Sequence, residues 1–240
     1  MCSNMLILSL DRELMPPGLG REGGTLHGGT ALKPSPFLCE IDGRMLVPSV
    51  LAFAAREYRD GGMIGAESFL LLDLDGSDAA LRVARAKLAF ADCCCAVAGV
   101  WLEVGDEFDR RVWRATVDFM SELCASCVVI LFVSAMQHPC VEKLVQELSA
   151  RIPGLRRSFS WRYDDTQLTK LACAYIKAMG VDIREEDRFV ASLQVRLAGR
   201  CTNSSGAIMI ADILARHAAA DEDNGVPYVS PLTLRRVLNT

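Results

Sequence analysis

The run of six apolar residues at Val128–Val133 constrains the fold more than any other stretch of the chain. A run this short and this uniformly apolar predicts a strand that is buried on both faces. The polar stretch Ser134–Pro139 predicts a loop, and Cys140–Arg151 then carries apolar residues at the spacing of one helix face. A buried strand, a loop and a helix in this order are the unit of an open parallel sheet. Ligands of such sheets bind at the C-terminal ends of the strands, so we expect function in the loops that follow the strands.

The same alternation of strands and helices covers the chain from Phe37 to Tyr163. Further strands are predicted at 37–41, 68–74, 96–104 and 158–163. Further helices are predicted at 48–58, 79–92 and 108–124. From Thr166 the pattern changes to amphipathic helices at 166–179, 184–199 and 205–220, with a final short helix at 231–238. The sequence therefore predicts an α/β body followed by a small helical appendage.

The stretch Pro16–Pro36 is rich in glycine and proline and is interpreted as a loop or mobile arm. Its Gly-Gly pairs suggest a phosphate-binding loop as a second interpretation. The residues that follow do not support it, because no Gly-Lys-Ser/Thr is present and Lys33 precedes Pro34.

Charge and cysteine usage limit the class of protein. The formal net charge is −4 with no long block of one sign, which argues against direct nucleic-acid binding. The 10 cysteines are not spaced like a disulfide framework, the apolar stretch Met5–Leu10 is too short for a secretory signal, and no run approaches the length of a membrane span. We therefore expect an intracellular protein in a reducing compartment, either the cytoplasm or an organellar matrix, with no membrane partner.

Several stretches resemble a known ATPase module. Val47–Ile64 resembles the helix after a phosphate-binding loop, and Ser68–Val104 resembles the second strand, its helix and the strand that ends in an acidic pair. Cys127–Phe159, with Pro153-Gly154-Leu155-Arg156, resembles the sensor strand and the "NPGLRSRF" segment, and Asn203–Ala219 resembles the lid helix. The segments that these stretches resemble belong to AAA+ ATPases, and the most similar subgroup is the CbxX/CfxQ type (CbbX and stage V sporulation protein K).

The resemblance implies a P-loop NTPase-like parallel sheet flanked by helices, with a C-terminal α-helical lid. It also implies a division of the chain into four parts. These are an N-terminal arm at 1–36, the AAA+-like body at 37–163, the helical lid at 164–220 and a tail at 221–240.

Most of the ATPase chemistry that the resemblance implies is missing. The loop should lie between Phe37 and Ser49, where Gly43 is the only glycine, the lysine position falls on or beside Val47, and Pro48 lacks the hydroxyl that holds Mg²⁺. The lid arginine expected after Asn203 is replaced by serines. The vestigial nucleotide region comprises Asp42, Gly43, Arg44, Asp106, Glu107 and Ser134.

Two features related to this site each allow two interpretations. Asp106-Glu107 lies two residues beyond the expected acidic pair, and is either a displaced pair or the solvated start of a helix. Arg156 and Arg157 are predicted at a subunit interface, because in the family such an arginine reaches the nucleotide of a neighbouring subunit. Otherwise they solvate a turn.

Cysteine and histidine positions offer two further candidate sites. Cys93–Cys95, Cys124 and Cys127 are expected at one edge of the sheet, where either zinc or plain packing accounts for them, and we predict no metal. His138 in the loop at 134–138, near Asp106 and Glu107, suggests an unrelated α/β enzyme with a small-molecule site as an alternative.

The favoured prediction is a catalytically inactive AAA+-like protein that binds no cofactor. It would be a structural or regulatory subunit with protein partners, either an active AAA+ homologue in a mixed ring or a larger complex. The first alternative is a weakly active remodelling ATPase that binds ATP and Mg²⁺ through Arg44, Asp106 and Glu107.

Overall fold

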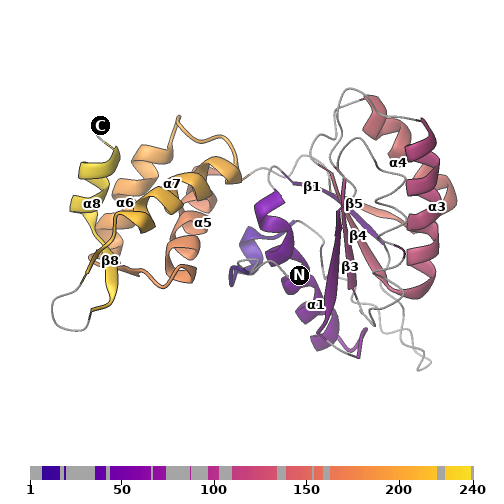
Figure 1. Cartoon of the computed structure of the whole chain (residues 1–240), viewed down its shortest axis with the longest axis horizontal. Coiled ribbons are helices and arrows are strands. Elements are labelled where there is room, and N and C mark those ends of the chain that lie inside the picture. Colours follow the sequence, from indigo (N-terminus) through magenta and orange to yellow (C-terminus); the bar gives the residue numbers. More distant parts are fainter. Residues whose placement is uncertain are drawn as a thin grey trace. The chain divides into compact units, whose positions relative to one another are not determined.

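The computed structural model describes residues 7–16, 19, 36–41, 44–65, 67–73, 87, 97–102, 110–133, 139–152, 154–158, 163–220 and 225–238. The chain divides into two compact units (Figure 1). Pro16–Trp161 forms one, here called the α/β unit. Met1–Met15 and Arg162–Thr240 together form the other, here called the helical unit. None of the described helices is both long and apolar enough to span a bilayer.

The α/β unit is built on a five-stranded sheet. Its strands are β1 (Phe37–Glu40), β2 (Phe69–Asp73), β3 (Val97–Leu102), β4 (Val128–Val133) and β5 (Arg156–Ser158). All pairs are parallel and the order is β2-β3-β4-β1-β5, which confirms the predicted α/β class. The last strand begins at Arg156 rather than at Ser158, because the Arg156 N–H donates to Pro36 O at 2.9 Å and the pairing with β1 starts there.

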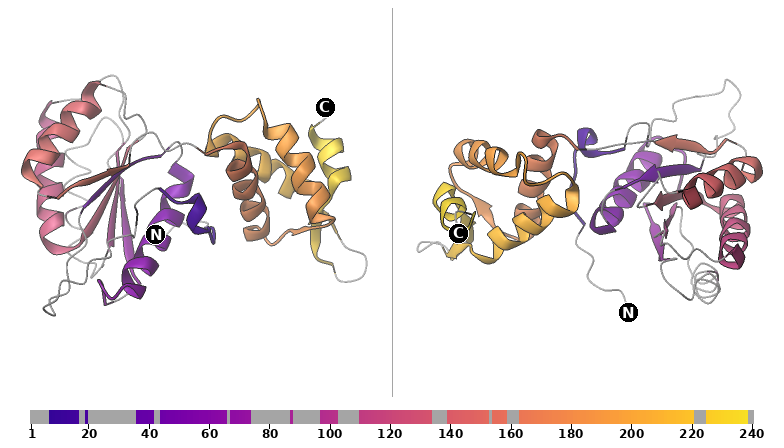
Figure 2. Two further views of the ribbon diagram at one scale, coloured as in Figure 1. Left: turned by 180° about the vertical axis from the view of Figure 1, so that it is seen from behind. Right: turned by 90° about the horizontal axis from the view of Figure 1, so that it is seen from above.

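Helices cover both faces of this sheet. Helix α1 (Val47–Asp60) lies on one face, and α3 (Arg110–Ser126) and α4 (Pro139–Arg151) lie on the other, as the views in Figures 1 and 2 show. A short 3-10 turn, η2 (Arg44–Leu46), leads into α1. The helix predicted at 79–92 lies outside the described residues apart from Lys87.

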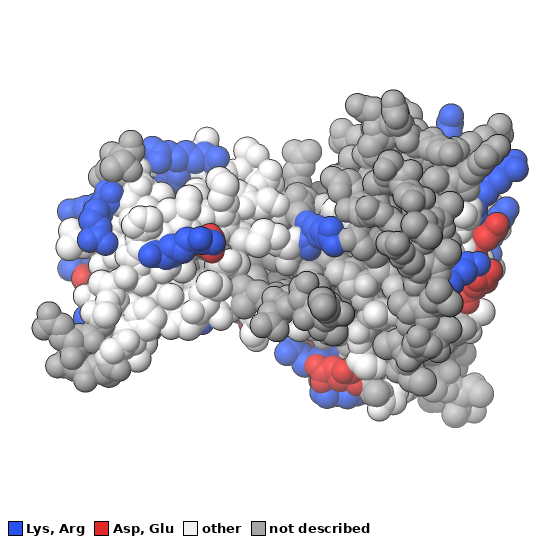
Figure 3. All heavy atoms as spheres, in the orientation of Figure 1, with Lys and Arg blue, Asp and Glu red and all other residues white. Residues whose placement is uncertain are grey.

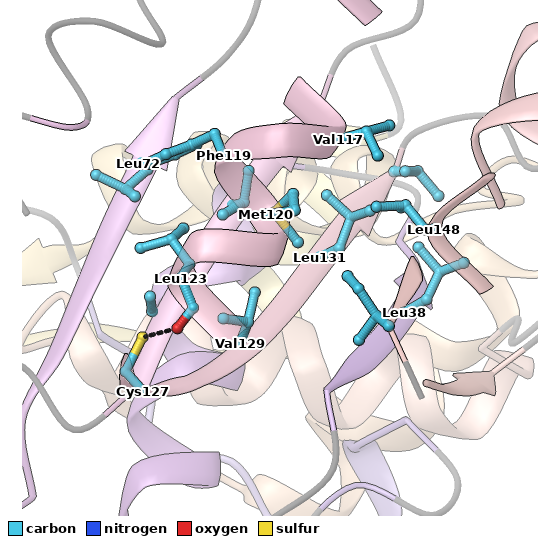
Figure 4. Packing of buried hydrophobic residues seen from close by; sticks show 14 of the residues in the cluster. Leu38, Leu72, Val117, Phe119, Met120, Leu123, Cys127, Val129, Leu131 and Leu148 are labelled. Carbon is cyan, nitrogen blue, oxygen red and sulfur yellow. Dashed lines mark hydrogen bonds between the residues drawn. The ribbon is translucent and has the colours of Figure 1, made fainter. Parts of the chain in front are cut away.

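The main core lies between the sheet and helices α3 and α4 (Figure 4). Alternate strand residues face these helices, so Leu38, Val129 and Leu131 belong to one buried cluster with Phe119 and Leu123 of α3. The central strand β4 is buried on both faces over its full length, as its uniformly apolar sequence predicts.

The opposite face brings α1 very close to β3. A Cβ atom built on Gly99 would lie 2.3 Å from Leu51 Cδ1 and 2.9 Å from Leu51 Cγ, and Leu51 is fully buried. A residue without a side chain is therefore required at Gly99 for α1 to pack on this strand.

The helical unit contains four helices and a small sheet. The helices are α5 (Asp165–Ala178), α6 (Glu186–Leu197), α7 (Ser204–Arg216) and α8 (Pro231–Leu238). The sheet has the order β6-β8-β7, formed by β6 (Asp182–Ile183), β8 (Pro227–Val229) and β7 (Ala219–Ala220). The helix predicted to reach Ala220 ends at Arg216, because Ala219–Ala220 pairs antiparallel with β8 instead.

The start of α5 is fixed by a capping box. The Asp164 carboxylate accepts from Gln167 N at 2.7 Å, and Gln167 Oε1 accepts from Asp164 N at 3.0 Å. The same Gln167 side chain donates through Nε2 to Glu13 O at 2.7 Å, so one residue caps the helix and holds the N-terminal segment.

The N-terminal segment around η1 (Arg12–Leu14) belongs to the helical unit. Tyr163 Oη donates to Leu14 O at 3.1 Å, and Lys170 forms an ion pair with Glu13. This grouping differs from the predicted division, which placed residues 1–36 in an arm. It also differs at the C-terminal end, because the segment predicted as a tail contributes β8 and the predicted helix α8 to the same unit.

Candidate functional site

The C-terminal edge of the parallel sheet is the place where a ligand site is expected. Helix α1 begins at this edge, because it follows β1 and runs back along the sheet. Of the predicted nucleotide region, the structure describes Arg44, which is exposed at the start of η2. The other predicted members, Asp42, Gly43, Asp106, Glu107 and Ser134, lie outside the described residues.

The N-terminus of α1 is covered by apolar side chains. Leu46 and Val47 are 0% exposed, and Pro48 is buried and has no N–H to donate. Leu46, the N-cap position, has a helical backbone (φ −85°, ψ −17°) and no side-chain cap, so η2 continues directly into α1. Anions bind helix N-termini through exposed N–H groups. The first turn of α1 is therefore shielded where a phosphate-binding helix needs to be open.

Trp101 is the residue of this region that the sequence analysis missed. It lies two residues after Gly99 in β3 and therefore on the same face as Gly99, toward α1. Two strand residues span about 6.6 Å, and four helix residues span about 6 Å. Since Gly99 lies against Leu51, this spacing puts Trp101 closer than Gly99 to the end of the sheet at which α1 begins.

The Trp101 indole is enclosed without a hydrogen bond. Trp101 is 3% exposed, and its Nε1 has no hydrogen-bond partner among the described residues. A buried donor left unpaired costs about 1–3 kcal/mol. Here a bulky buried ring stands near the C-terminal end of β3, on the face that α1 covers. The sequence signal was a single tryptophan close to the end of an otherwise small and aliphatic strand.

Arg156 lies at the opposite, N-terminal edge of the sheet. Its partner in the β1–β5 ladder is Phe37, the first residue of β1. The Arg156 guanidinium carbon lies 6.0 Å from the centroid of the Phe37 ring, and the residue is half-buried. Arg157 pairs with Leu38 in the same ladder, and its side chain lies outside the described residues. Arg156 thus contacts its own chain at this edge.

The lid position predicted to lack its arginine is a capped helix start. Asn203 Oδ1 accepts from Gly206 N at 2.8 Å, and Ser204 is fully buried. The serines therefore form part of the packed start of α7 in the helical unit.

The cysteine and histidine candidates are only partly described. Cys127 is buried and its Sγ donates to Leu123 O at 3.5 Å (dashed in Figure 4), while Cys93–Cys95 and His138 lie outside the described residues. Within the described ranges, no group of three or more metal-binding side chains occurs. Burial, and secondarily Glu186, raises the pKa of the Cys173 thiol from 9.0 to about 11, so this thiol stays protonated at neutral pH.

No known protein family matches the sequence, and no curated protein matches it either. Solved structures do resemble the chain, among them AAA+ ATPase-like proteins. "Structure of C. elegans PCH-2" matches with 10% identity and a TM-score of 0.48, covering 85% of this chain and 58% of that chain. Domain III of the Thermotoga maritima replication initiation protein DnaA matches with 11% identity and a TM-score of 0.49, covering 88% of each chain.

A third similar structure is titled "Structure of E. coli MS115-1 HORMA:CdnC:Trip13 complex". It matches with 16% identity and a TM-score of 0.43, covering 86% of this chain and 72% of that chain. At these identities the likeness concerns fold alone. The assignment of the α/β class depends on the strand order and on the helices that cover both faces of the sheet.

Proposed function

We propose that the chain is an AAA+-like protein that does not hydrolyse ATP and acts as a structural or regulatory subunit of a larger assembly. The observation that carries the first half of this proposal is the covered first turn of α1. Leu46 and Val47 are fully buried there, and Pro48 has no N–H.

The chemistry of phosphate binding explains why this observation matters. A triphosphate needs backbone N–H groups that wrap it, a lysine that offsets its charge and a hydroxyl that holds Mg²⁺. Apolar side chains stand where those groups are needed, and the buried Trp101 lies on the same face of β3 as Gly99, which approaches Leu51 of α1. Arg44 is the one described cation of the predicted region, and it alone does not supply this set of groups.

Nucleotide binding is tested by thermal unfolding of the full chain with Mg²⁺ alone and with Mg²⁺ and ATP. All 3 tryptophans lie within Pro16–Trp161, so their fluorescence reports the α/β unit. A site with a Kd of about 10 μM would, at about 1 mM ATP, stabilise the folded state by about 2.7 kcal/mol. That stabilisation corresponds to a rise in Tm of about 5–10 °C for a chain of this size. We expect no rise and no phosphate release.

A matched pair of variants shows what a positive result would mean. If ATP raises the Tm and Arg44→Ala removes the rise, while Arg114→Ala on the exposed face of α3 keeps it, the nucleotide site is functional and the proposal is wrong. If neither variant nor the wild type responds to ATP, the closed helix start explains the result.

The second half of the proposal concerns partners. The expected partner is an active AAA+ homologue or a larger complex, and Arg156 and Arg157 are the residues proposed to face it. The test is purification of the tagged chain from its own cells, with mass measured by light scattering. We expect a heteromeric species that Arg156→Glu disrupts and Arg114→Glu does not. Recovery of wild type as a clean monomer would contradict an assembly role.

A further inference from the structure

A groove runs between helices α6 and α8 of the helical unit. One face of α6 forms one wall, with Arg188, Ala191 and Ser192, and Glu185 lies at its end. Pro231, Leu232 and Arg235 of α8 form the other wall. The groove has a volume of about 430 Å³ and is open to solvent.

Two unusually exposed apolar side chains lie in this groove or next to it on α6. Among the described residues, the two most exposed large hydrophobic side chains are Val195, at 76%, and Leu232, at 73%. Leu232 lines the groove, and Val195 lies one helical turn beyond Ala191 on the same face of α6. Leu232 in the groove and Val195 beyond it along α6 thus give this face two apolar side chains that a partner could cover.

The charge of the groove is positive. Two arginines, Arg188 and Arg235, line it together with one carboxylate, Glu185. The Arg188–Glu185 pair, at 3.0 Å, is solvent-exposed on both sides and is therefore weak and easily exchanged. Arg235 has no ion pair with any described residue. In the view of Figure 3, the part of the helical unit that is visible also shows more basic than acidic side chains.

We propose that the groove between α6 and α8 binds an acidic amphipathic helix of a partner protein. Helix α6 has 12 residues and α8 has 8, so a partner helix of about two to three turns would match the length of the helices that form the walls. Apolar residues at helical spacing on the partner would contact Leu232 and Val195. Carboxylates on its flanks would pair with Arg188 and Arg235, as in other grooves that bind amphipathic helices. The groove belongs to the helical unit and the nucleotide region belongs to the α/β unit, so this proposal can hold or fail independently of the one above.

The first experiment measures binding of a designed probe to the full chain by fluorescence anisotropy. The probe is a labelled peptide of about three turns, with leucines at helical spacing and glutamates on both flanks. A matched peptide carries lysines in place of the glutamates. We expect the acidic peptide to bind at least about tenfold more tightly than the basic one, with an affinity that falls as salt is added.

Variants then assign the binding to the groove. Leu232→Ser and Arg235→Glu each change an exposed side chain and are expected to weaken the acidic peptide by about tenfold. Met209→Ser changes a side chain that is 62% exposed on α7, and it should leave binding unchanged. Equal binding of the two peptides, or no effect of Leu232→Ser, would overturn the proposal.

A crosslinking experiment identifies the natural occupant. A benzophenone amino acid is placed at Leu232 or, as the control, at Met209, and the full chain is irradiated in its own cells. Capture at Leu232 alone of an acidic amphipathic segment of another protein supports the proposal. Capture of a second copy of this chain, of a basic segment or of membrane lipid would contradict it, as would equal capture at Met209.

Discussion

The substitution Gly99→Ala tests the close packing of α1 on the sheet. The new Cβ atom would lie 2.3 Å from Leu51 Cδ1, 2.7 Å from Leu51 Cδ2 and 2.9 Å from Leu51 Cγ. Because Leu51 is 0% exposed, its side chain has no free space to move into. Three of its atoms are too close at once, so a rotation of the methyl groups does not relieve the overlap. The helix must shift away from β3.

The expected loss in the free energy of unfolding is about 1–3 kcal/mol, the usual cost of overpacking a core. Leu51→Ala alone should cost about 2–5 kcal/mol, because it leaves a cavity. In the double variant the alanine methyl at position 99 partly fills that cavity. The loss of stability in the double variant should therefore be smaller than the sum of the two single losses by about 1–3 kcal/mol.

The assay is urea unfolding of the full chain followed by tryptophan fluorescence, which reports the α/β unit because all 3 tryptophans lie within it. Gly65→Ala is the control, since a Cβ atom there meets nothing within 4 Å. It should change the stability by less than about 0.5 kcal/mol. If Gly99→Ala is as stable as Gly65→Ala, or if the losses at Gly99 and Leu51 simply add, the close approach of α1 to β3 is wrong.

Three further changes test other parts of the structure. Trp101→Phe removes an unpaired buried N–H and keeps an aromatic ring, so urea unfolding should show no loss beyond about 1 kcal/mol, and a loss above about 2 kcal/mol would mean that the indole is hydrogen-bonded. Burial raises the pKa of the Cys173 thiol from 9.0 to about 11, which means that the folded state favours the neutral thiol. The stability that this thiol contributes is therefore fully present below pH 9 and is lost as the pH rises to about 11. Cys173→Ala should flatten the decline in Tm over that range in circular dichroism melts, and an unchanged decline would refute the assignment. Gln167→Ala should cost more than Asp164→Ala, by about 1 kcal/mol in the same melts, because it removes two side-chain hydrogen bonds, from Asp164 N and to Glu13 O, whereas Asp164→Ala removes the one bond from Gln167 N; equal losses would contradict the link to Glu13.

Local sequence predicted much of the architecture. The strand at Val128–Val133 has the predicted bounds, and so does the final helix Pro231–Leu238. Both are specified by short-range signals, namely a uniformly apolar run in one case and a proline at the helix start in the other. The parallel order of the sheet follows from the alternation of strands and helices, which leaves few alternatives.

Other features depend on residues that are distant in sequence, and the sequence analysis missed them. Ala219–Ala220 has a good helix pattern, but pairing with β8 keeps it extended. The strand β5 starts where Pro36 O accepts its first hydrogen bond, which no pattern near Arg156 reveals. In the candidate site, the loss of glycines was readable from the chain. The burial of Trp101 on the face of β3 that α1 covers was not, because it depends on how the helix packs on the sheet.

The hydrogen bond between Tyr163 and Leu14 joins residues 149 positions apart. Translation proceeds at about 5–20 residues per second. The segment at 7–15 therefore leaves the ribosome roughly 8 to 30 s before its partners on α5 are synthesised. Its buried side chains Leu8, Leu10 and Leu14 have no α5 to pack on during this interval. Completion of the helical unit must wait until α5 to α8 have been synthesised, and removal of residues 1–15 would take away part of that unit even though every helix from α5 to α8 remains.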